Sequence, residues 1–300
     1  MKEKLIKIIF PFILISTVFL LTYCLFYWLV FIRLKLIDLD DIIFGLFVPS
    51  GISAVLFWFY FRKKLLLLNM KDKHREFTLF ISWILSTLSV LTFIFYLDRE
   101  TGELTQLKSV DEIWNNKPTM YYSIESSSQH KNRSGLFVAK GYPNRGNEIG
   151  IGCYYACPLT DKGDSIYKNN IWIGTMFGDK FSNRVFDDKE KQAKLITQFI
   201  DSSVTLYNKY EYKTTFLKRL SNSDVREDYL KAIQQTNLPF DNKNVIILTE
   251  ESGSYESRSG TSLWWTVFFI ITSNLTWTLL TIFTKPRSPK SSQERLRKCL

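Results

Sequence analysis

Four long stretches without a charged residue or a histidine constrain the fold of this chain more than any other feature of its sequence. They run from Ile8 to Ile32, from Ile42 to Phe61, from Phe77 to Leu97 and from Leu263 to Thr284. Each reaches the length of about 20 residues that an α-helix needs to cross the apolar core of a bilayer. The sequence therefore predicts an α-helical membrane protein with four transmembrane helices, at about residues 5–32, 42–61, 77–97 and 262–284.

The segment between the third and fourth stretches, residues 98–261, is predicted to form an inserted soluble domain. Its part from Asp98 to Arg258 contains 22 Lys and Arg residues against 22 Asp and Glu, whereas the rest of the chain contains 17 against 7. The net charge of +10 therefore belongs to the flanks of the apolar stretches. A neutral domain offers no extended basic surface for phosphates, so we expect the lipid bilayer and no nucleic acid as a partner.

Basic residues at the ends of the apolar stretches predict the orientation of the protein in the membrane. Short flanks rich in lysine and arginine stay in the cytoplasm, and three flanks have this composition. Their basic residues are Lys2, Lys4 and Lys7; Arg62, Lys63, Lys64, Lys71, Lys73 and Arg75; and Lys285, Arg287, Lys290, Arg295, Arg297 and Lys298. Four alternating helices place all three flanks on one side. We therefore expect both termini, with the basic tail 285–300, to be cytoplasmic and residues 98–261 to be extracytoplasmic.

The inserted segment has the pattern of a mixed α and β domain. Ser109 to Glu112 is typical of a capping box that opens a short helix. Runs rich in Ile, Val, Tyr and Phe predict strands at residues 119–125, 136–140, 148–157, 171–177, 212–217 and 245–249. A helical period returns at residues 187–207 and again in a helix that runs to about Gln235. Ser223 or Ser221 is expected to cap this second helix. Its predicted inner face consists of Val225, Tyr229, Ala232 and Ile233. This order predicts an α+β domain built on a small antiparallel sheet.

Cys153 and Cys157 are a candidate disulfide, because a domain outside the cytoplasm would lie in an oxidising compartment. Four residues of an extended strand span about 13 Å, however, which is about twice the Cα separation that a disulfide allows. A bond would need a turn or a bulge between the two cysteines. The alternatives are a metal site, for which no partners are visible, and burial of both thiols as apolar groups.

The sequence shows no complete catalytic, metal-binding or cofactor-binding set. Its two histidines are His74, in a basic loop, and His130, which lies among serines without a nucleophile-elbow motif. Many carboxylates fall at predicted helix starts, where they stabilise the helix dipole. Glu256 and Arg258, just before the fourth apolar stretch, are candidates for contact with a partner at the membrane surface.

The apolar stretches contain several Ser, Thr and Asn residues but no charged group. Transport of ions or protons usually depends on ionisable side chains inside the membrane, so a transporter is not predicted. Small polar side chains instead favour close helix packing and hydrogen bonds between helices. We therefore expect a helix bundle that forms a homo-oligomer or binds a protein partner in the bilayer.

Several phrases of the sequence, taken together, resemble a known family. They are Thr101-Gly102-Glu103-Leu104-Thr105 before Val110-Asp111-Glu112-Ile113; Tyr155-Ala156-Cys157-Pro158-Leu159; Phe216-Leu217-Lys218-Arg219-Leu220 before Ser223-Asp224; and Tyr255-Glu256-Ser257-Arg258-Ser259-Gly260 before Leu263-Trp264. The pattern resembles the membrane-plus-soluble accessory region that precedes the protease core in some bacterial rhomboid-like proteins. Rhomboid proteases cleave with the serine of a Gly-x-Ser-Gly motif and a histidine on another transmembrane helix, and the apolar stretches contain neither. The resemblance therefore implies an accessory region without proteolytic activity.

These features predict a non-catalytic, multi-pass protein of the bacterial cytoplasmic (inner) membrane whose external domain binds a partner protein or an envelope component. Two alternatives stay open. One is an enzyme that acts at the membrane surface, or an accessory of a membrane protease. The other is a pore-forming or membrane-disrupting effector with a cytoplasmic sensor domain, which would require the inverted orientation.

Overall fold

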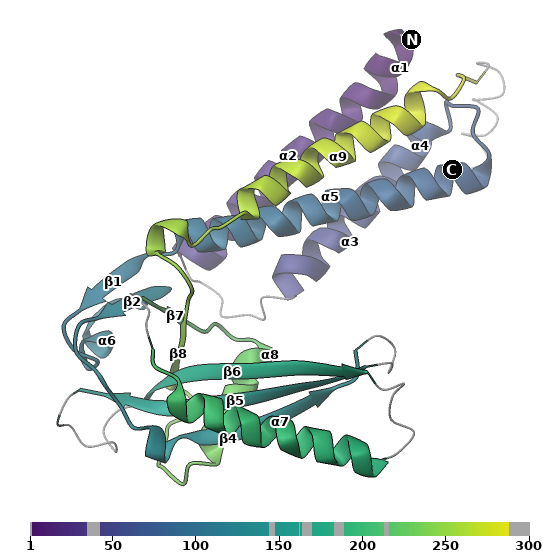
Figure 1. Cartoon of the computed structure of the whole chain (residues 1–300). Helices are drawn as coiled ribbons and strands as arrows, with labels where there is room; N and C mark the ends of the chain where they lie inside the picture. The colour runs from purple at the N-terminus through teal and green to yellow at the C-terminus, as the bar shows by residue number, and fades with distance from the viewer. Residues whose placement is uncertain are drawn as a thin grey trace. The chain divides into compact units, whose positions relative to one another are not determined.

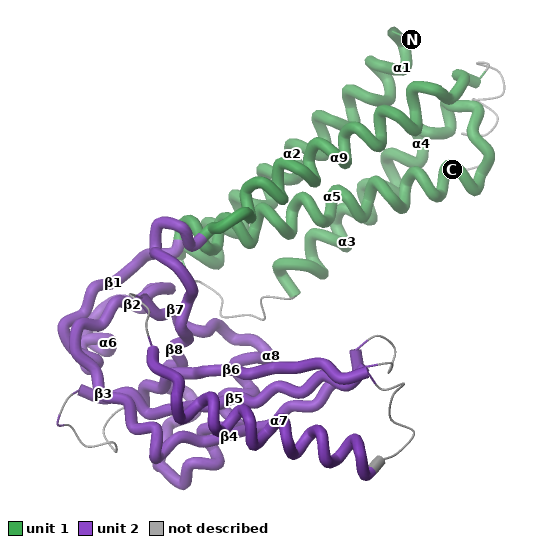
Figure 2. The backbone as a smooth tube through the Cα atoms, viewed as in Figure 1, with its two compact units in different colours: residues 1–101, 259–300 green, residues 102–258 purple. Residues whose placement is uncertain are grey.

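The structure is a computed structural model that describes residues 2–34, 43–143, 148–161, 163, 170–182, 189–212 and 216–287 of the 300-residue chain. The chain divides into two compact units (Figure 2). Unit 1 comprises residues 1–101 and 259–300, and unit 2 comprises residues 102–258. Unit 2 is therefore a single insertion into unit 1. The predicted tail from residue 288 onward lies outside the described residues.

Within the described part of the chain, four helices are long and apolar enough to cross a membrane. They span Lys2–Arg33, Ile43–Leu65, Asp72–Thr101 and Tyr255–Ile282. Their α-helical parts are α1 (Lys2–Lys4), α2 (Phe10–Tyr27), α3 (Val48–Val55), α4 (Arg62–Leu65), α5 (Asp72–Thr101) and α9 (Ser262–Ile282), as Figure 1 shows. The first two spans also contain the π-helical segments Leu5–Ile9, Trp28–Arg33, Ile43–Phe47 and Leu56–Phe61.

The helices of unit 1 bury small polar side chains together with apolar ones, and they carry large apolar side chains on the outside. Where α5 and α9 pack side by side (Figure 1), the buried hydroxyls of Ser86 and Ser273 lie 3.2 Å apart. A second buried pair, Ser53 of α3 and Thr87 of α5, is also separated by 3.2 Å. On the outside, by contrast, Phe59 is 69% exposed. An outside of large apolar side chains is unlike that of a water-soluble bundle, and it suits a lipid environment.

A cluster of aromatic rings joins three of the four helices of unit 1. Phe12 of α2 stacks on Trp277 of α9, with ring centroids 4.3 Å apart. Phe61, from the second span, contacts both rings, at 5.2 Å from Phe12 and 5.4 Å from Trp277. All three side chains are buried, so this cluster forms one end of the core of the unit.

In the described residues of unit 2, the chain forms an eight-stranded sheet. The strands are β1 (Leu104–Leu107), β2 (Tyr121–Ile124), β3 (Ser128–Gln129), β4 (Gly135–Gly141), β5 (Glu148–Thr160), β6 (Ile171–Ser182), β7 (Leu217–Arg219) and β8 (Ile246–Glu250). Their order is β1-β2-β7-β8-β6-β5-β3, and β4 also pairs with β5. The helices of the unit are α6 (Glu112–Asn115), α7 (Lys189–Lys209) and α8 (Asp224–Gln234).

The sheet is mixed rather than purely antiparallel, which corrects the prediction. β1 pairs in parallel with β2, and β6 pairs in parallel with β8, whereas the other described pairs are antiparallel. Parallel neighbours need a crossover connection, which α6 provides for the first pair and the segment with α7 and α8 for the second. Ile246, Ile247 and Leu248 of β8 are all buried, as in a strand that is covered on both faces.

Helices cover both faces of the long strands (Figure 1). On one face, Tyr229 and Ile233 of α8 pack in one core with Tyr154 and Trp172 of the sheet. α7 lies on the other face, where Tyr207 shares a core with residues of β5. Both cores use the alternation of side chains along β5, since Tyr154 points to one face and its neighbours to the other.

The start of α8 follows the prediction in part. The Ser223 hydroxyl accepts a hydrogen bond from the Arg226 amide at 3.3 Å, which is the predicted cap. Val225, predicted on the inner face, is instead 42% exposed. The inner face is formed by Tyr229, Ala232 and Ile233. Val225 stands in the first turn, ahead of the part of the helix that contacts the sheet.

The predicted capping box of Ser109 and Glu112 is not formed. The Asp161 carboxylate, just after β5, accepts hydrogen bonds from the amides of Val110 at 2.5 Å and Asp111 at 3.4 Å. Glu112 accepts one from the Lys108 amide at 2.9 Å. A residue that is distant in sequence therefore holds the turn that precedes α6, which a local motif cannot reveal.

Candidate binding site on the soluble unit

The two cysteines of the candidate disulfide are both free in the structure. Cys153 and Cys157 lie on the continuous strand β5, which keeps them apart along its length. Both side chains are buried, and burial raises the pKa of each thiol. The disulfide that the sequence left open is therefore not formed, and the thiols serve as apolar groups of the core.

His130 pairs with a threonine and not with one of the serines beside it in the sequence. Its Nε2 atom lies 2.9 Å from the Thr160 hydroxyl. Its amide donates to the Pro158 carbonyl at 3.2 Å, three residues before Asp161. Among the described residues, no group of three His, Cys, Asp or Glu side chains could hold a metal ion.

Arg258, the last residue of unit 2, packs against Tyr255. It stacks on the Tyr255 ring, with 3.9 Å from its Cζ to the ring centroid, and its Nη1 donates to the Tyr255 carbonyl at 2.8 Å. The Tyr255 hydroxyl donates to the Gly102 carbonyl at 2.6 Å, so the first and last turns of the unit are tied together. Glu256 is exposed, and hydrogen bonds from its own amide and from Ser254 lower the pKa of its carboxyl group. Recognition of a partner by Glu256 and Arg258 stays a prediction.

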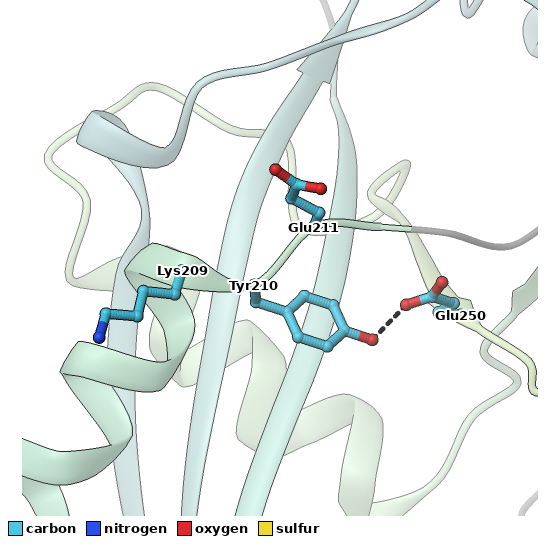
Figure 3. Close-up of a pocket in the computed structure, with 4 residues that line it drawn as sticks. All are labelled: Lys209, Tyr210, Glu211 and Glu250. Atoms are coloured by element: carbon cyan, nitrogen blue, oxygen red, sulfur yellow. Dashed lines mark hydrogen bonds between the residues drawn. The ribbon is translucent and has the colours of Figure 1, made fainter.

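A pocket of about 290 Å³ lies where α7 and β8 end (Figure 3). It is lined by Lys209, Tyr210, Glu211 and Glu250. The Tyr210 hydroxyl donates a hydrogen bond to the Glu250 carboxylate across the pocket. Figure 3 shows the Lys209 side chain extending away from this pair. The pocket therefore presents an aromatic ring and two carboxylates, with the Lys209 ammonium directed away from the Tyr210–Glu250 pair.

The end of α7 is held in place by a lysine from another part of the unit. The Lys131 ammonium donates to the carbonyls of Tyr207, at 3.3 Å, and of Tyr210. Basic side chains at this position satisfy the last carbonyls of a helix and favour its dipole. Lys131 therefore fixes the backbone that carries the pocket tyrosine.

Neighbouring rings fix the side chain of Tyr210. It makes edge contacts with Phe177, at 6.1 Å between centroids, and with Tyr212, at 5.2 Å. The Tyr212 hydroxyl lies 2.6 Å from that of Thr175 on β6. Tyr210 is therefore attached to the sheet through a second tyrosine, and its hydroxyl has a fixed direction toward Glu250.

Two carboxylates and one ammonium group line the pocket, so its net negative charge favours a positively charged ligand. Burial, together with the adjacent Glu250 carboxylate, raises the pKa of Tyr210 to about 12, so its hydroxyl remains a donor at neutral pH. Carboxylates form the stronger, charge-assisted hydrogen bonds with ammonium and guanidinium groups, and an aromatic ring attracts the same cations. This arrangement can therefore bind a lysine- or arginine-like group, with no chemistry required.

Comparison of the chain with protein-family models, curated proteins and solved structures finds no match. The resemblance to rhomboid accessory regions therefore stays a prediction. The function of the pocket has to be argued from its own residues.

The sequence did not reveal this pocket. Tyr207, Tyr210 and Tyr212 are a signal that was available, since three tyrosines close a predicted helix. Glu250 is forty residues away from Tyr210 along the chain. Only the position of β8 in the sheet brings the two together, and the sheet order could not be derived from the strand pattern.

Proposed function

We propose that this chain is a multi-pass membrane protein whose soluble unit binds a positively charged partner without catalysis. The observation that carries the proposal is the pocket in which Tyr210 donates to Glu250 beside Glu211. A basic segment of a partner protein offers the ammonium and guanidinium groups that such a pocket accepts. The four apolar helices would hold this binding unit at the membrane.

The distribution of side chains in unit 1 supports the membrane part of the proposal. Large apolar residues on its outside would cost free energy in water and none in lipid. The buried pairs Ser53–Thr87 and Ser86–Ser273 are typical of contacts between helices in a bilayer. The placement we propose is the bacterial cytoplasmic membrane, with both termini in the cytoplasm and residues 102–258 outside.

Protease treatment of spheroplasts tests this orientation. In intact spheroplasts that carry a C-terminal tag, an added protease should cut within residues 102–258 and leave the tag intact. Addition of detergent should then expose the tag. If the protease instead removed the tag from intact spheroplasts and left residues 102–258 uncut, the orientation would be inverted. An effector with a cytoplasmic sensor domain would need that orientation.

Titration of the full-length protein in detergent tests the pocket. Trilysine is the probe, triglutamate is its counterpart of opposite charge, and isothermal titration calorimetry measures the binding of each. We expect trilysine to bind and Glu250→Gln to weaken its affinity about tenfold, because a charge-assisted hydrogen bond contributes roughly 1.5 kcal/mol or more. Equal binding of the two peptides would rule out the proposed preference.

Glu125→Gln provides the matched control. Glu125 is an exposed carboxylate of the same unit, just after β2, and it does not line the pocket. Both variants change the net charge of the protein by the same amount. If they weaken trilysine binding equally, the peptide is attracted by the overall charge of the unit and the pocket is not its site.

A further inference from the structure

The outer face of the second helix of unit 1 carries a groove of about 450 Å³. Six of the residues that line it are Ala54, Val55, Trp58, Phe59, Arg62 and Lys63. They form three pairs of adjacent residues that recur every four residues along one helix, which places them on one face. Phe59 is 69% exposed and Val55 57%, so apolar side chains line an open surface.

The wall of this groove is fixed by contacts with α5. The Trp58 ring packs edge to face on Trp83, with centroids 6.0 Å apart. The Trp83 indole nitrogen donates to the Ser50 carbonyl at 3.0 Å. Trp58 therefore rests on a second ring that is itself held in place, and the groove does not depend on a mobile side chain.

The groove changes from apolar to basic along the helix. Ala54, Val55, Trp58 and Phe59 form its apolar part, and Arg62 and Lys63 form its basic end. The eight steps from Val55 to Lys63 rise at most about 12 Å, which is the value for an α-helix at 1.5 Å per residue, since Leu56–Phe61 is π-helical. This length is close to half of the roughly 30 Å bilayer core, which is the depth of one leaflet. The groove thus has the dimensions and the polarity of a single lipid.

The basic end keeps a net positive charge in spite of its ion pairs. Arg62 pairs with Glu76 at 3.0 Å, and the same carboxylate lies 3.6 Å from Arg75. Arg75 also pairs with Asp72 at 3.0 Å. Two carboxylates therefore face three cations here once Lys63 is counted. An added phosphate would complement the remaining charge.

We propose that this groove binds one anionic phospholipid, with its phosphate at Arg62 and Lys63 and an acyl chain along Val55, Trp58 and Phe59. A free phosphate would use the basic end alone and leave the apolar part empty, which is why the lipid is the better occupant. The inference rests on the membrane placement proposed above for unit 1. It adds a specific site to that placement, on the flank expected to be cytoplasmic, where anionic lipids attract basic residues.

Native mass spectrometry of the full-length protein tests the site. The protein is purified in detergent and equilibrated with equal amounts of phosphatidylglycerol and phosphatidylcholine of matched chain length. We expect one phosphatidylglycerol to be retained in preference. The double variant Arg62→Gln, Lys63→Gln should lower the ratio of the two bound lipids roughly 5- to 25-fold, since each basic residue near an anionic surface contributes about a fivefold effect.

Lys71→Gln, Lys73→Gln is the control for charge alone. Both lysines are exposed in the same basic connection, and neither lines the groove. We expect this variant to keep the lipid preference, and an equal loss would overturn the proposal. Ala54→Trp fills the groove while its charges remain, and it should abolish lipid retention in protein that keeps its circular dichroism. Retention in that folded variant, or displacement of the lipid by inorganic phosphate, would also overturn it.

Failure of the lipid site can be distinguished from failure of the membrane placement. Alkaline carbonate releases peripheral proteins and leaves integral ones in the membrane. Release of this chain by carbonate would refute the placement. Retention in the carbonate pellet together with no preference for phosphatidylglycerol would refute the lipid site alone.

Discussion

At Gly135, the close packing of α8 on the sheet leaves no room for a side chain. A Cβ atom built there would lie 1.8 Å from the Ala232 carbonyl oxygen, which belongs to the helix backbone and cannot move aside alone. We expect Gly135→Ala to lower the free energy of unfolding by about 2 kcal/mol or more. The thermal midpoint should then fall by roughly 4–8 °C. Circular dichroism of the full-length protein in detergent measures this change.

Gly141→Ala is the matched control on the same strand. A Cβ atom at Gly141 would meet no atom within 4 Å. The thermal midpoint of this variant should stay within about 1–2 °C of the parent, because a small exposed change is usually worth less than 0.5 kcal/mol. Equal destabilisation by both substitutions would contradict the assignment of the effect to the Ala232 contact.

The roles of single residues depended on partners that are distant along the chain. The turn before α6 is held by Asp161, and the pocket of Tyr210 is completed by Glu250. Neither pair is near in sequence, so the local motifs pointed elsewhere, to Ser109 in the first case. The two cysteines were different, because the spacing of Cys153 and Cys157 along one strand is a local property. The argument from strand length agrees with the free thiols.

At the scale of elements, the packing of α5 against α9 leads to a prediction about the buried serine pair. Ser86 and Ser273 lie 3.2 Å apart between the two helices. In a double-mutant cycle with Ser86→Ala and Ser273→Ala, we expect a coupling of roughly 0.6 kcal/mol, the average for such bonds inside a membrane protein. Equilibrium unfolding in mixed micelles measures the four free energies.

Ser89 gives the comparison for this cycle. It is also buried on α5, but its hydroxyl donates to the Leu85 carbonyl of its own helix at 2.9 Å. A cycle of Ser89→Ala with Ser273→Ala should therefore give a coupling close to zero. If the coupling free energy of Ser89 with Ser273 were as large as that of Ser86 with Ser273, loss of any buried hydroxyl would have the same effect. The coupling could then not be assigned to the hydrogen bond between Ser86 and Ser273.

Most elements could be predicted from the sequence, because their signals are local. The apolar stretches became helices, and the runs at residues 136–140, 148–157 and 171–177 lie in β4, β5 and β6. The short strands β1 and β3 were missed, since four and two residues carry too little alternation to be recognised. The parallel pairing was missed as well. It depends on which strands become neighbours after a crossover, and this information is spread over the whole unit.

At the scale of the whole molecule, the charge and the polarity of the chain are divided between its two units. The excess of basic residues lies outside the segment from Asp98 to Arg258, in which basic and acidic residues are equal in number. Unit 1 also has an apolar outside, and its interior combines apolar side chains with buried hydroxyl groups. The average composition of the chain does not show that its charge and its apolar residues are divided between two units. The positions of these residues along the sequence do show it.

The hydrogen bond from Tyr255 to Gly102 has a consequence for the history of such a chain. The two ends of unit 2 lie close together. If the unit were removed, a short connection would be enough to join the two helices between which it is inserted. One recombination event could therefore add, remove or exchange residues 102–258 without a new design of the helical bundle. Unit 1 and unit 2 would then be free to diverge at different rates, each under its own selection.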